Sequence, residues 1–318
     1  MTPQQNLRKL PPLRHGDTVR LIAPSSPFER ESFERGLKEI ERLGFRTSYS
    51  ARIFDRDGYF AGDLSARTAD FAEALSDTES RAVFCVRGGY GAAELLDTLQ
   101  TLPRGSPKLL LGFSDATVLQ IFLWQTAWWV TLYGPAVALG FAGGADVSDG
   151  YDAASLQNAL ANTRAGWTMD LRGEMLAAGS AEGVVLGGCL TIVESTLGTP
   201  WELDTTGAIL MLEDRAMKPF QVDRSLLHLR QAGKFTRIRG VILGDFPECE
   251  PPGGNGVTIR DVCLRHFADM GIPIVWKVPI GHTARPMLTV PLGVRAGLHA
   301  GAETRLEILE PAFAEPEG

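Results

Sequence analysis

The chain has 318 residues, of which 44% are hydrophobic and 22% charged, and its formal net charge is −7. These values are typical of a folded globular protein and exclude a collagen-like or low-complexity chain. The negative charge, and the lack of a long run among the 31 Lys and Arg residues, argue against nucleic-acid binding, which requires a basic surface. Since a domain has typically about 100–200 residues, the length predicts two domains.

The cysteines lie far apart and form no Cys-x-x-Cys pair, which argues against a zinc or redox motif. We interpret them as reduced structural thiols, as is usual in the cytosol. The N-terminus carries polar residues and prolines where a signal peptide would need an apolar stretch, so we expect a cytoplasmic protein. The four positions are Cys85, Cys189, Cys249 and Cys263.

Residues 116–145 contain no charged side chain and could be mistaken for a membrane segment. A spanning helix needs about 20 predominantly apolar residues in a row. Gln120, Gln125, Gly134 and Pro135 interrupt this stretch. It therefore predicts a buried helix followed by a buried strand, and no membrane partner.

The first half alternates apolar strand patterns with amphipathic helical patterns. This alternation predicts an α/β domain, residues 1–150, with a mostly parallel sheet covered by helices on both faces. The strands are expected at residues 18–23, 82–86, 108–112 and 129–133, and the helices at 29–43, 65–75, 92–99 and 117–126.

Residues 151–172 predict a connection, because the sequence around them is rich in Gly, Ala, Asp and Ser and carries a weak helical pattern at 154–161. A C-terminal domain, residues 173–318, follows, and its pattern predicts an α+β or β-barrel-like fold. The strands are expected at residues 183–186, 208–212, 240–243, 274–278, 288–291 and 304–309, with a strong helix at 220–231.

Residues 109–117 combine an apolar strand with a Gly-Phe-Ser-Asp turn that leads directly into a predicted helix. Such a strand-to-helix elbow exposes the hydroxyl of Ser114 at the end of a sheet and places the backbone N–H of Asp115 beside a developing oxyanion. The hydrolase pattern Gly-x-Ser-x-Gly is incomplete, since Ala116 stands at the second glycine position. The alternative interpretation is an ordinary helix N-cap.

A second glycine-rich turn, Arg-Gly-Gly-Tyr-Gly at residues 87–91, follows another predicted strand. Glycines let the backbone approach a ligand and direct N–H groups at it, which suits a second oxyanion donor. A phosphate cradle is an alternative, but the spacing matches neither the dinucleotide-binding nor the Walker pattern. A plain tight turn is the other alternative.

A nucleophilic serine needs a base, and the chain has five histidines. His228 and His266 lie in helical patterns, where a structural role is expected. His282 follows an apolar strand and lies in a loop, where catalytic groups are commonly mounted. The imidazole needs a carboxylate to fix its tautomer, and Glu213 and Asp214 end another apolar strand. Either carboxylate could serve, and a polar strand end is the alternative reading.

Motifs along nearly the whole chain resemble the LD-carboxypeptidase family of serine peptidases, which also contains the microcin C self-immunity peptidases. One departure is Cys189, which stands where the family often has Asn. The motifs are Ile-Ala-Pro-Ser-Ser-Pro at 22–27, Arg-Gly-Gly-Tyr-Gly at 87–91, Gly-Phe-Ser-Asp at 112–115, Gly-Gly-Cys-Leu at 187–190, Leu-Gly-Thr-Pro at 197–200, Leu-Glu-Asp at 212–214, Val-Ile-Leu-Gly-Asp-Phe at 241–246 and Pro-Ile-Gly-His at 279–282.

The resemblance implies a triad of Ser114 as nucleophile, His282 as general base and Glu213, rather than Asp214, as the acidic member. It implies an oxyanion hole made by the backbone amides of Gly89 and Asp115. It also implies two domains with the active site at their interface, commonly in a homodimer, and no metal or other cofactor.

The reaction implied by the resemblance is release of terminal D-alanine from a cytoplasmic murein tetrapeptide through an acyl-enzyme, as in peptidoglycan recycling. A carboxypeptidase must hold a free carboxylate, and a guanidinium can bind one in bidentate fashion. We therefore expect Arg87, beside Gly88, to bind the substrate.

Two alternatives remain open at this point. The first keeps the triad but makes the chain a self-immunity peptidase that cleaves aminoacyl-nucleotide antibiotics of the microcin C type, with tryptophans stacking on the base. The second is a non-catalytic binding protein with two lobes around a ligand. Binding alone, however, requires neither a serine elbow nor a loop histidine with a strand-end carboxylate.

Overall fold

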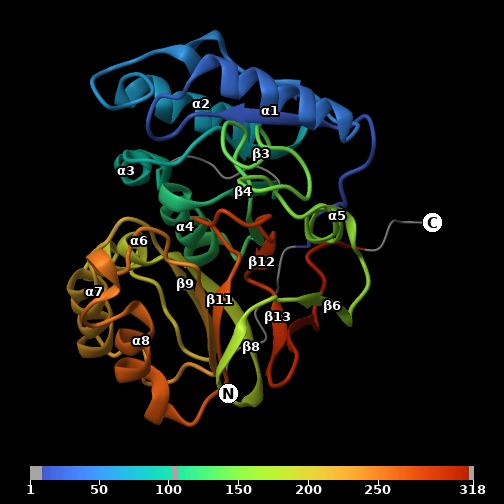
Figure 1. Cartoon of the computed structure of the whole chain (residues 1–318). Helices are drawn as coiled ribbons and strands as arrows, with labels where there is room; N and C mark the ends of the chain where they lie inside the picture. Colours follow the sequence, from blue (N-terminus) through green and yellow to red (C-terminus); the bar gives the residue numbers. More distant parts are fainter. Residues whose placement is uncertain (1–8, 102–106, 315–318) are drawn as a thin grey trace. The chain divides into compact units, whose positions relative to one another are not determined.

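The computed structural model describes residues 9–101 and 107–314, and they form two compact units. Unit 1 comprises Met1–Thr163, Arg285–Gly293 and Pro311–Gly318, and unit 2 comprises Arg164–Ala284 and Val294–Glu310. The chain therefore returns to unit 1 twice after leaving it, which one boundary near residue 150 does not describe. Figure 1 shows the course of the chain through both units.

Unit 1 is built on a six-stranded sheet in the order β12-β5-β4-β3-β1-β2. Five neighbouring strands are parallel, and β12 joins β5 in the antiparallel direction. The α/β fold expected for the first half is thus confirmed. The strands are β1 (Thr18–Ile22), β2 (Arg46–Ser48), β3 (Ser80–Cys85), β4 (Leu109–Gly112), β5 (Thr131–Tyr133) and β12 (Val290–Leu292).

The helices of unit 1 follow the expected patterns. The side chain of Asp63 caps the second helix by accepting a hydrogen bond from the N–H of Ala66, and the first helix buries one stripe of Phe33, Gly36 and Ile40. The helices are α1 (Arg30–Arg42), α2 (Leu64–Ser76), α3 (Leu96–Leu99), α4 (Thr117–Ala127) and α5 (Ala153–Ala161).

The uncharged segment at residues 116–145 contributes to the core of unit 1. Residues Thr117 to Trp124 of α4 are all buried, and so is the whole of β5. The prediction of a buried helix followed by a buried strand is therefore confirmed. Across the described parts of the chain, no helix is both long enough and apolar enough to span a membrane.

Unit 2 contains an eight-stranded mixed sheet in the order β6-β14-β13-β8-β9-β10-β11-β7. Its centre, from β8 to β11, is parallel, and antiparallel strands flank it on both sides. The order is that of an open sheet, so the barrel-like alternative does not apply. The strands are β6 (Trp167–Asp170), β7 (Glu174–Ala177), β8 (Gly179–Cys189), β9 (Ala208–Glu213), β10 (Gly240–Gly244), β11 (Ile274–Val278), β13 (Arg295–Ala300) and β14 (Thr304–Ile308).

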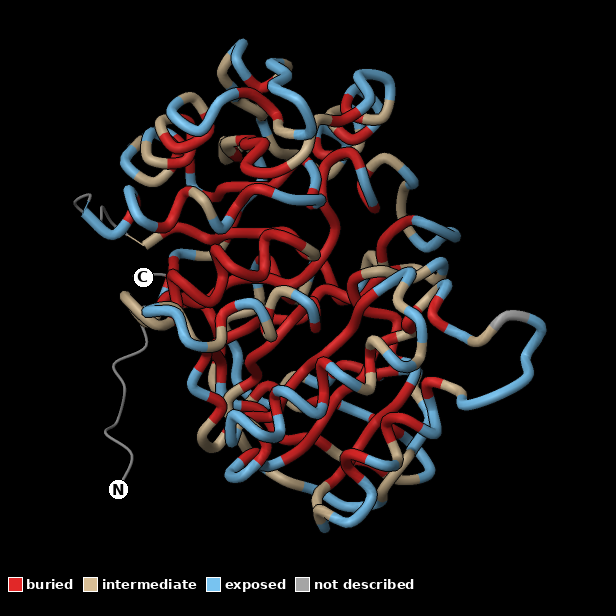
Figure 2. The backbone as a smooth tube through the Cα atoms, turned by 90° about the vertical axis from the view of Figure 1, so that its left-hand side faces the viewer, coloured by how far each residue is buried: buried red, intermediate tan, exposed pale blue. Residues whose placement is uncertain are grey.

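Three helices pack together in unit 2 (Figure 1): α6 (Leu190–Ser195), α7 (Pro219–Gln231) and α8 (Ile259–Phe267). The residues of the central strands of each sheet are buried. Figure 2 shows buried residues in the interior and exposed residues mainly along the loops at the surface. Parallel central strands buried on both faces explain why β9 and β10 read as continuous apolar runs rather than alternating ones.

One strand lies in a different sheet from the one expected. The sequence assigned residues 288–291 to the β-rich tail of the second half, but β12 pairs with β5 in unit 1. An apolar run indicates that a strand is buried, but it does not indicate which sheet the strand joins. Short strands such as β6 and β7 escaped sequence analysis because three or four residues give too little periodicity.

The strand directions place the candidate residues at defined edges. In unit 1, β3 and β4 are parallel neighbours, so the turns that follow Cys85 and Gly112 lie at the same edge of the sheet. In unit 2, β9, β10 and β11 are parallel, so Glu213 and the loop after Val278 also share one edge. Ligand sites in parallel sheets commonly lie at such carboxyl edges.

We predict that Leu210→Ala destabilises the protein by about 2–5 kcal/mol, because Leu210 lies in the middle of β9 with no exposed surface and its loss leaves a cavity. Urea unfolding followed by circular dichroism measures the change. The control is Leu64→Ala, at a side chain that is 43% exposed, for which less than about 0.5 kcal/mol is expected. Equal effects of the two substitutions would contradict this packing.

Candidate active site

Ser114 occupies a strained turn between β4 and α4. Its φ angle is +61°, in the left-handed region that non-glycine residues seldom adopt, and the preceding Phe113 is fully extended. The N–H of Ser114 donates a hydrogen bond of 3.2 Å to the hydroxyl of the buried Tyr133 at the end of β5. Strain of this kind is retained where the surroundings fix it, and it is characteristic of a serine held outward on an elbow.

The glycine-rich turn after β3 passes directly beside this serine. A Cβ atom added at Gly88 would lie 2.7 Å from the Cβ and 2.9 Å from the Oγ of Ser114, and 3.2 Å from the backbone nitrogen of Asp115. Only glycine permits that approach. Gly89 follows with a φ of +112°, and a Cβ there would meet the side chain of Ser26. Unit 1 therefore brings together Ser114, Asp115, Gly88 and Gly89, as the sequence predicts.

The side chain of Asp115 ties the two turns to each other. It is buried, and its Oδ2 accepts a hydrogen bond of 2.8 Å from the N–H of Ala92, just after the glycine-rich turn. Burial raises the pKa of Asp115, and the hydrogen bond from Ala92 counteracts part of that effect. The side chain thus has a structural role, separate from the role expected for its backbone N–H.

Arg87 is exposed at the start of the same turn. Its Nη1 donates a hydrogen bond of 2.6 Å to the carbonyl oxygen of Pro27. That contact fixes one end of the guanidinium group on the loop after β1. A guanidinium carries five N–H donors, so this bond does not exhaust its capacity to bind a carboxylate.

Glu213 and His282 form a buried pair in unit 2. Glu213 ends β9 with no exposed surface, and its Oε2 lies 2.9 Å from the Nδ1 of His282 and accepts a second bond of 2.9 Å from the backbone N–H of the same residue. An ionised carboxylate can only accept, so Nδ1 carries the hydrogen. The pair fixes both the position and the tautomer of the imidazole and leaves Nε2 as the nitrogen that can accept a proton.

Two glycines enclose the Glu213 carboxylate. A Cβ atom at Gly281, whose φ is +58°, would lie 2.6 Å from Oε1 of Glu213, and one at Gly244 would lie 2.5 Å from its Cβ. The backbone of the loop before His282 therefore lies directly against the carboxylate. Both glycines belong to motifs that carry the family resemblance, but sequence analysis assigned a role to neither.

The pKa of His282 is raised above its ordinary value. Burial alone lowers it, but the negative charge of Glu213, the hydrogen bond to it and the charge of Asp214 together outweigh burial. A carboxylate beside a histidine favours the imidazolium form in this way. The site therefore stabilises the protonated state that a general base reaches during a reaction.

Asp214 is engaged elsewhere. Its Oδ2 accepts hydrogen bonds from the N–H (2.8 Å) and the hydroxyl (2.6 Å) of Thr191 and from the thiol of Cys189 at 3.5 Å. Burial, followed by the charge of Glu213, raises the pKa of Asp214. Of the two strand-end carboxylates, only Glu213 contacts His282 in the described hydrogen bonds. The buried Cys189 thiol thus contacts Asp214, and burial raises the pKa of this thiol well above its usual range.

The other histidines have other environments. His266 is buried and hydrogen-bonds Asp223, and burial is the main cause of its lowered pKa. His228 contacts Glu194 from an exposed position on α7. Both fit the structural roles predicted for them, and His15 is exposed on unit 1.

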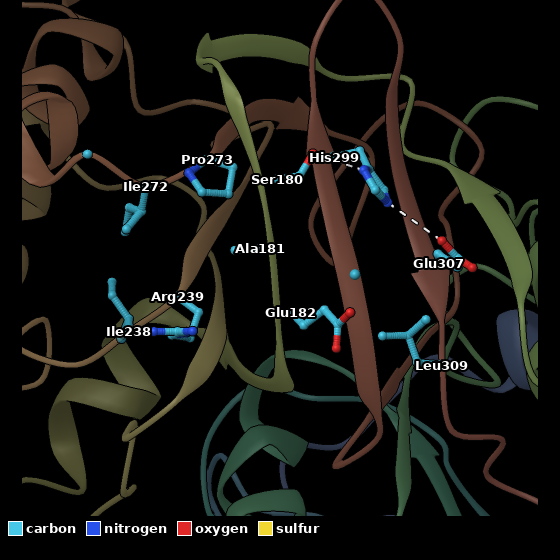
Figure 3. A pocket seen from close by; sticks show the side chains of 12 residues that line it. Ser180, Ala181, Glu182, Ile238, Arg239, Ile272, Pro273, His299, Glu307 and Leu309 are labelled. Carbon is cyan, nitrogen blue, oxygen red and sulfur yellow. Dashed lines mark hydrogen bonds and ion pairs between the residues drawn. The ribbon is translucent and has the colours of Figure 1, made fainter.

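A hollow of about 670 Å³ lies elsewhere in unit 2. Figure 3 shows His299 between Ser180 and Glu307 on its wall, and the Ser180 hydroxyl lies 3.0 Å from Nδ1 of that histidine. Other wall residues, such as Pro273, precede the central parallel strands, whereas Glu213 and His282 follow them. The hollow is therefore at the opposite edge of the sheet and contains none of the predicted site residues.

The arrangement of potential metal ligands does not point to a metal centre in the described residues. Within residues 9–101 and 107–314, no group of three or more His, Cys, Asp or Glu is arranged to hold an ion.

Comparison with known proteins shows where these features belong. Models of the LD-carboxypeptidase N-terminal and C-terminal domains match residues 19–134 and 182–298, which contain every predicted site residue. The chain belongs to the LD-carboxypeptidase family. A probable murein peptide carboxypeptidase of Bacillus subtilis is 33% identical over 306 residues, covering 95% of this chain and 94% of the relative. The murein tetrapeptide carboxypeptidase of Pseudomonas aeruginosa is 28% identical, covering 84% and 88%.

Solved structures agree on the fold. The muramoyltetrapeptide carboxypeptidase of Oxalobacter formigenes, 27% identical, superposes with a TM-score of 0.78 over 92% of this chain and 99% of its own. The microcin C7 self-immunity protein MccF in its wild-type apo state, 22% identical, superposes with a TM-score of 0.85 over 96% and 99%. At 22% identity, the likeness to MccF shows a shared fold and nothing about function. This LD-carboxypeptidase family member is therefore a carboxypeptidase with a mixed α/β fold.

We predict that the NMR titration of His282 has a midpoint above that of an ordinary histidine, and that Glu213→Gln lowers it, because the substitution removes the charge that opposes burial. A general base must be neutral to accept a proton, so the base role predicted for His282 implies that kcat/KM falls as pH drops below this raised pKa. Since the folded-state pKa is raised, the stability contributed by His282 is complete below the unfolded pKa and is lost as pH rises through the folded one.

His266→Gln serves as the control, because that histidine lies on α8 and pairs with Asp223 instead. An unchanged His282 midpoint in Glu213→Gln would show that the carboxylate does not set the protonation of this histidine.

Proposed function

We propose that this protein is a serine LD-carboxypeptidase that releases the terminal D-alanine of a murein tetrapeptide, with Ser114, His282 and Glu213 as its triad. The observation that carries the proposal is the buried Glu213–His282 pair, which fixes the tautomer that a general base needs. The strained elbow of Ser114 supplies the nucleophile. Relatives named murein peptide or murein tetrapeptide carboxypeptidase support the substrate class.

In the proposed first step, Oγ of Ser114 attacks the carbonyl carbon of the L,D-peptide bond while Nε2 of His282 accepts the hydroxyl proton. The oxyanion that forms accepts hydrogen bonds from the backbone N–H groups of Gly89 and Asp115, where each such donor is worth roughly 3–4 kcal/mol. Glu213 stabilises the imidazolium through Nδ1.

The tetrahedral intermediate then collapses. His282 returns its proton to the amide nitrogen, the carbon–nitrogen bond breaks and D-alanine leaves, which gives an acyl ester on Ser114. Water attacks this ester with His282 again accepting a proton, and the tripeptide departs as the carboxylate while the serine hydroxyl is restored. Every proton in this sequence is held by groups of the chain, the substrate or water, so the steps call for no cofactor.

The proposed setting is the cytoplasm, in peptidoglycan recycling. The four cysteines are buried thiols, a state that a reducing compartment maintains. We also propose a homodimer, as the family resemblance implies, and sedimentation analysis of the purified protein tests it.

An aminoacyl-nucleotide of the microcin C type remains the competing substrate for the same triad. The likeness to MccF, at 22% identity, concerns the fold and so does not favour that substrate. A non-catalytic two-lobed binding protein is disfavoured by membership of a peptidase family.

We predict that the purified protein releases D-alanine from L-Ala-γ-D-Glu-meso-diaminopimelate-D-Ala with a chelator present. Ser114→Ala should lower kcat by at least about 10³-fold, because the acyl-enzyme can no longer form. Coupled assay of free D-alanine measures the release.

The matched control is Ser180→Ala, which removes a serine hydroxyl that is also hydrogen-bonded to a histidine but lies outside the proposed triad. Its activity should equal that of the wild type. No release by folded wild-type protein, together with cleavage of an aminoacyl-sulfamoyl adenosine, would replace the murein substrate by the nucleotide one.

We predict that Arg87→Ala raises KM by about tenfold or more, because the terminal carboxylate of the substrate loses a charged, bidentate donor. The same variant should discriminate less against a substrate whose terminal carboxylate is amidated. Arg56→Ala, also exposed on unit 1, is the control. If Arg87→Ala left both KM and kcat unchanged, Arg87 would not be the carboxylate clamp.

A further inference from the structure

Two neighbouring strands of unit 2 are each associated with a carboxylate that reaches the loop carrying His282. β9 ends at Glu213, which binds both the ring and the backbone N–H of His282. β10 ends at Gly244, and the next residue, Asp245, accepts a hydrogen bond from the hydroxyl of Thr283. Two consecutive residues of one loop are therefore held from two adjacent strands. The proposed triad accounts for the first contact and leaves the second without a role.

The loop depends on such contacts because it has no regular backbone ladder. Residues 279–284, all within the described part of the chain, follow β11 and belong to no helix or strand. The chain then leaves unit 2 after Ala284. Thr283 is thus the last residue but one before this exit. A bond at Thr283 fixes the end of the loop, while Glu213 fixes the residue before it.

The loop also packs closely on the two strand ends. A Cβ atom at Gly244 would lie 3.3 Å from Cγ1 of Ile280. One at Gly281 would lie 2.6 Å from Oε1 of Glu213. The N–H of Ile280 donates a hydrogen bond of 2.8 Å to the carbonyl oxygen of Val278, which closes a tight turn directly after β11. A small displacement of this loop therefore moves the imidazole relative to a carboxylate that is fixed at the end of a buried strand.

The backbone around Asp245 is itself held firmly. Phe246, directly after it, is buried, and its ring stacks on Trp276 of β11 with the centroids 5.9 Å apart. The φ angle of Phe246 is +49°, and a left-handed residue of this kind persists where the surroundings hold the backbone. The carbonyl oxygen of Pro247 accepts a hydrogen bond of 2.9 Å from the N–H of Ala216, which follows β9. The carboxylate of Asp245 therefore extends from a fixed turn.

We propose that Asp245 is a positioning residue for the reaction, which acts through Thr283 to hold the loop where Nε2 of His282 can accept the proton of the nucleophile. The inference rests on the proposed function, because the exact place of this imidazole matters to the reaction if His282 is the base. Asp245 contacts neither the substrate nor the reacting atoms in this role, and no chemical step is assigned to it.

The role assigned to Asp245 is geometric rather than electrostatic. The largest effects on the pKa of His282 come from its burial and from three charged neighbours, Glu213, Asp214 and Arg215. Asp245 instead contacts the next residue of the loop through an uncharged hydroxyl. Loss of this bond should therefore lower kcat without moving the pH at which activity declines, whereas Glu213→Gln should move that pH.

The test compares Thr283→Val, which keeps the shape of the side chain without its hydroxyl, with Thr283→Ser, which keeps the hydroxyl. Thr283→Val should lower kcat for D-alanine release by about ten- to hundredfold, because a slightly misplaced base is costly, and should leave KM within about twofold. Thr283→Ser should have a kcat close to that of the wild type. Asp245→Ala should match Thr283→Val, and the double variant should lose no more than either single variant.

Thr258→Val is the matched control, because the Thr258 hydroxyl also donates to a carboxylate of unit 2, that of Asp261 at the start of α8. The control should keep the kcat and the pH profile of the wild type. An equal loss of kcat in the control would trace the effect to general destabilisation and overturn the proposal, as would an unchanged kcat in Thr283→Val. So would a rise in KM alone, which would make Asp245 a substrate-binding group, or a pH profile displaced as in Glu213→Gln.

Failure of the proposed function has a different signature. In that case wild-type protein releases no D-alanine, whereas NMR still reports on the loop. The Nδ1–H of His282 is hydrogen-bonded to Glu213, and its exchange with water should be at least about tenfold faster in Thr283→Val, because the loop then opens more often. An exchange rate equal to that of the wild type would overturn the positioning role whether or not turnover is observed.

Discussion

A carboxylate without exposed surface must be compensated inside the fold, and in unit 2 the compensation for Glu213 comes from His282. The carboxylate accepts two hydrogen bonds from this one residue, through its ring and its backbone. Gly281 and Gly244 lie so close to the Glu213 side chain that a Cβ atom at either position would collide with it. Substitution of His282 by Ala would remove the ring hydrogen bond to the buried carboxylate and keep the bond from the backbone N–H. The structural requirement and the proposed chemical role therefore coincide, because the bond that stabilises the carboxylate also fixes the imidazole tautomer.

In unit 1, Ser114 lies beside the glycine-rich turn, and the backbone N–H groups of Gly89 and Asp115 are the proposed oxyanion donors. Parallel β3 and β4 end at one edge, so their two turns meet there, and the missing side chain of Gly88 allows contact with Ser114. Asp115 and Arg67 then tie the surrounding loops with buried hydrogen bonds.

Sequence reasoning identified the α/β alternation, the Ser114 elbow and the strand-end position of Glu213, because each depends on local pattern. It could not show which of Glu213 and Asp214 contacts His282, because Asp214 is held by Thr191 in α6 and by Cys189 at the end of β8, far from it in the sequence. Nor could the sequence show that β12 pairs with β5 in the sheet of unit 1. These features join residues far apart in the chain, and no periodicity reports them.

The central claim is that Ser114 is a nucleophile activated by the Glu213–His282 pair. Its most direct test is mass-spectrometric mapping of the protein after reaction with a fluorophosphonate, which labels activated serines. We predict one adduct, on Ser114, that forms at least about tenfold more slowly in Glu213→Gln and His282→Ala, because the base is then misoriented or missing. An adduct on another serine, or a labelling rate that neither substitution changes, would contradict the account.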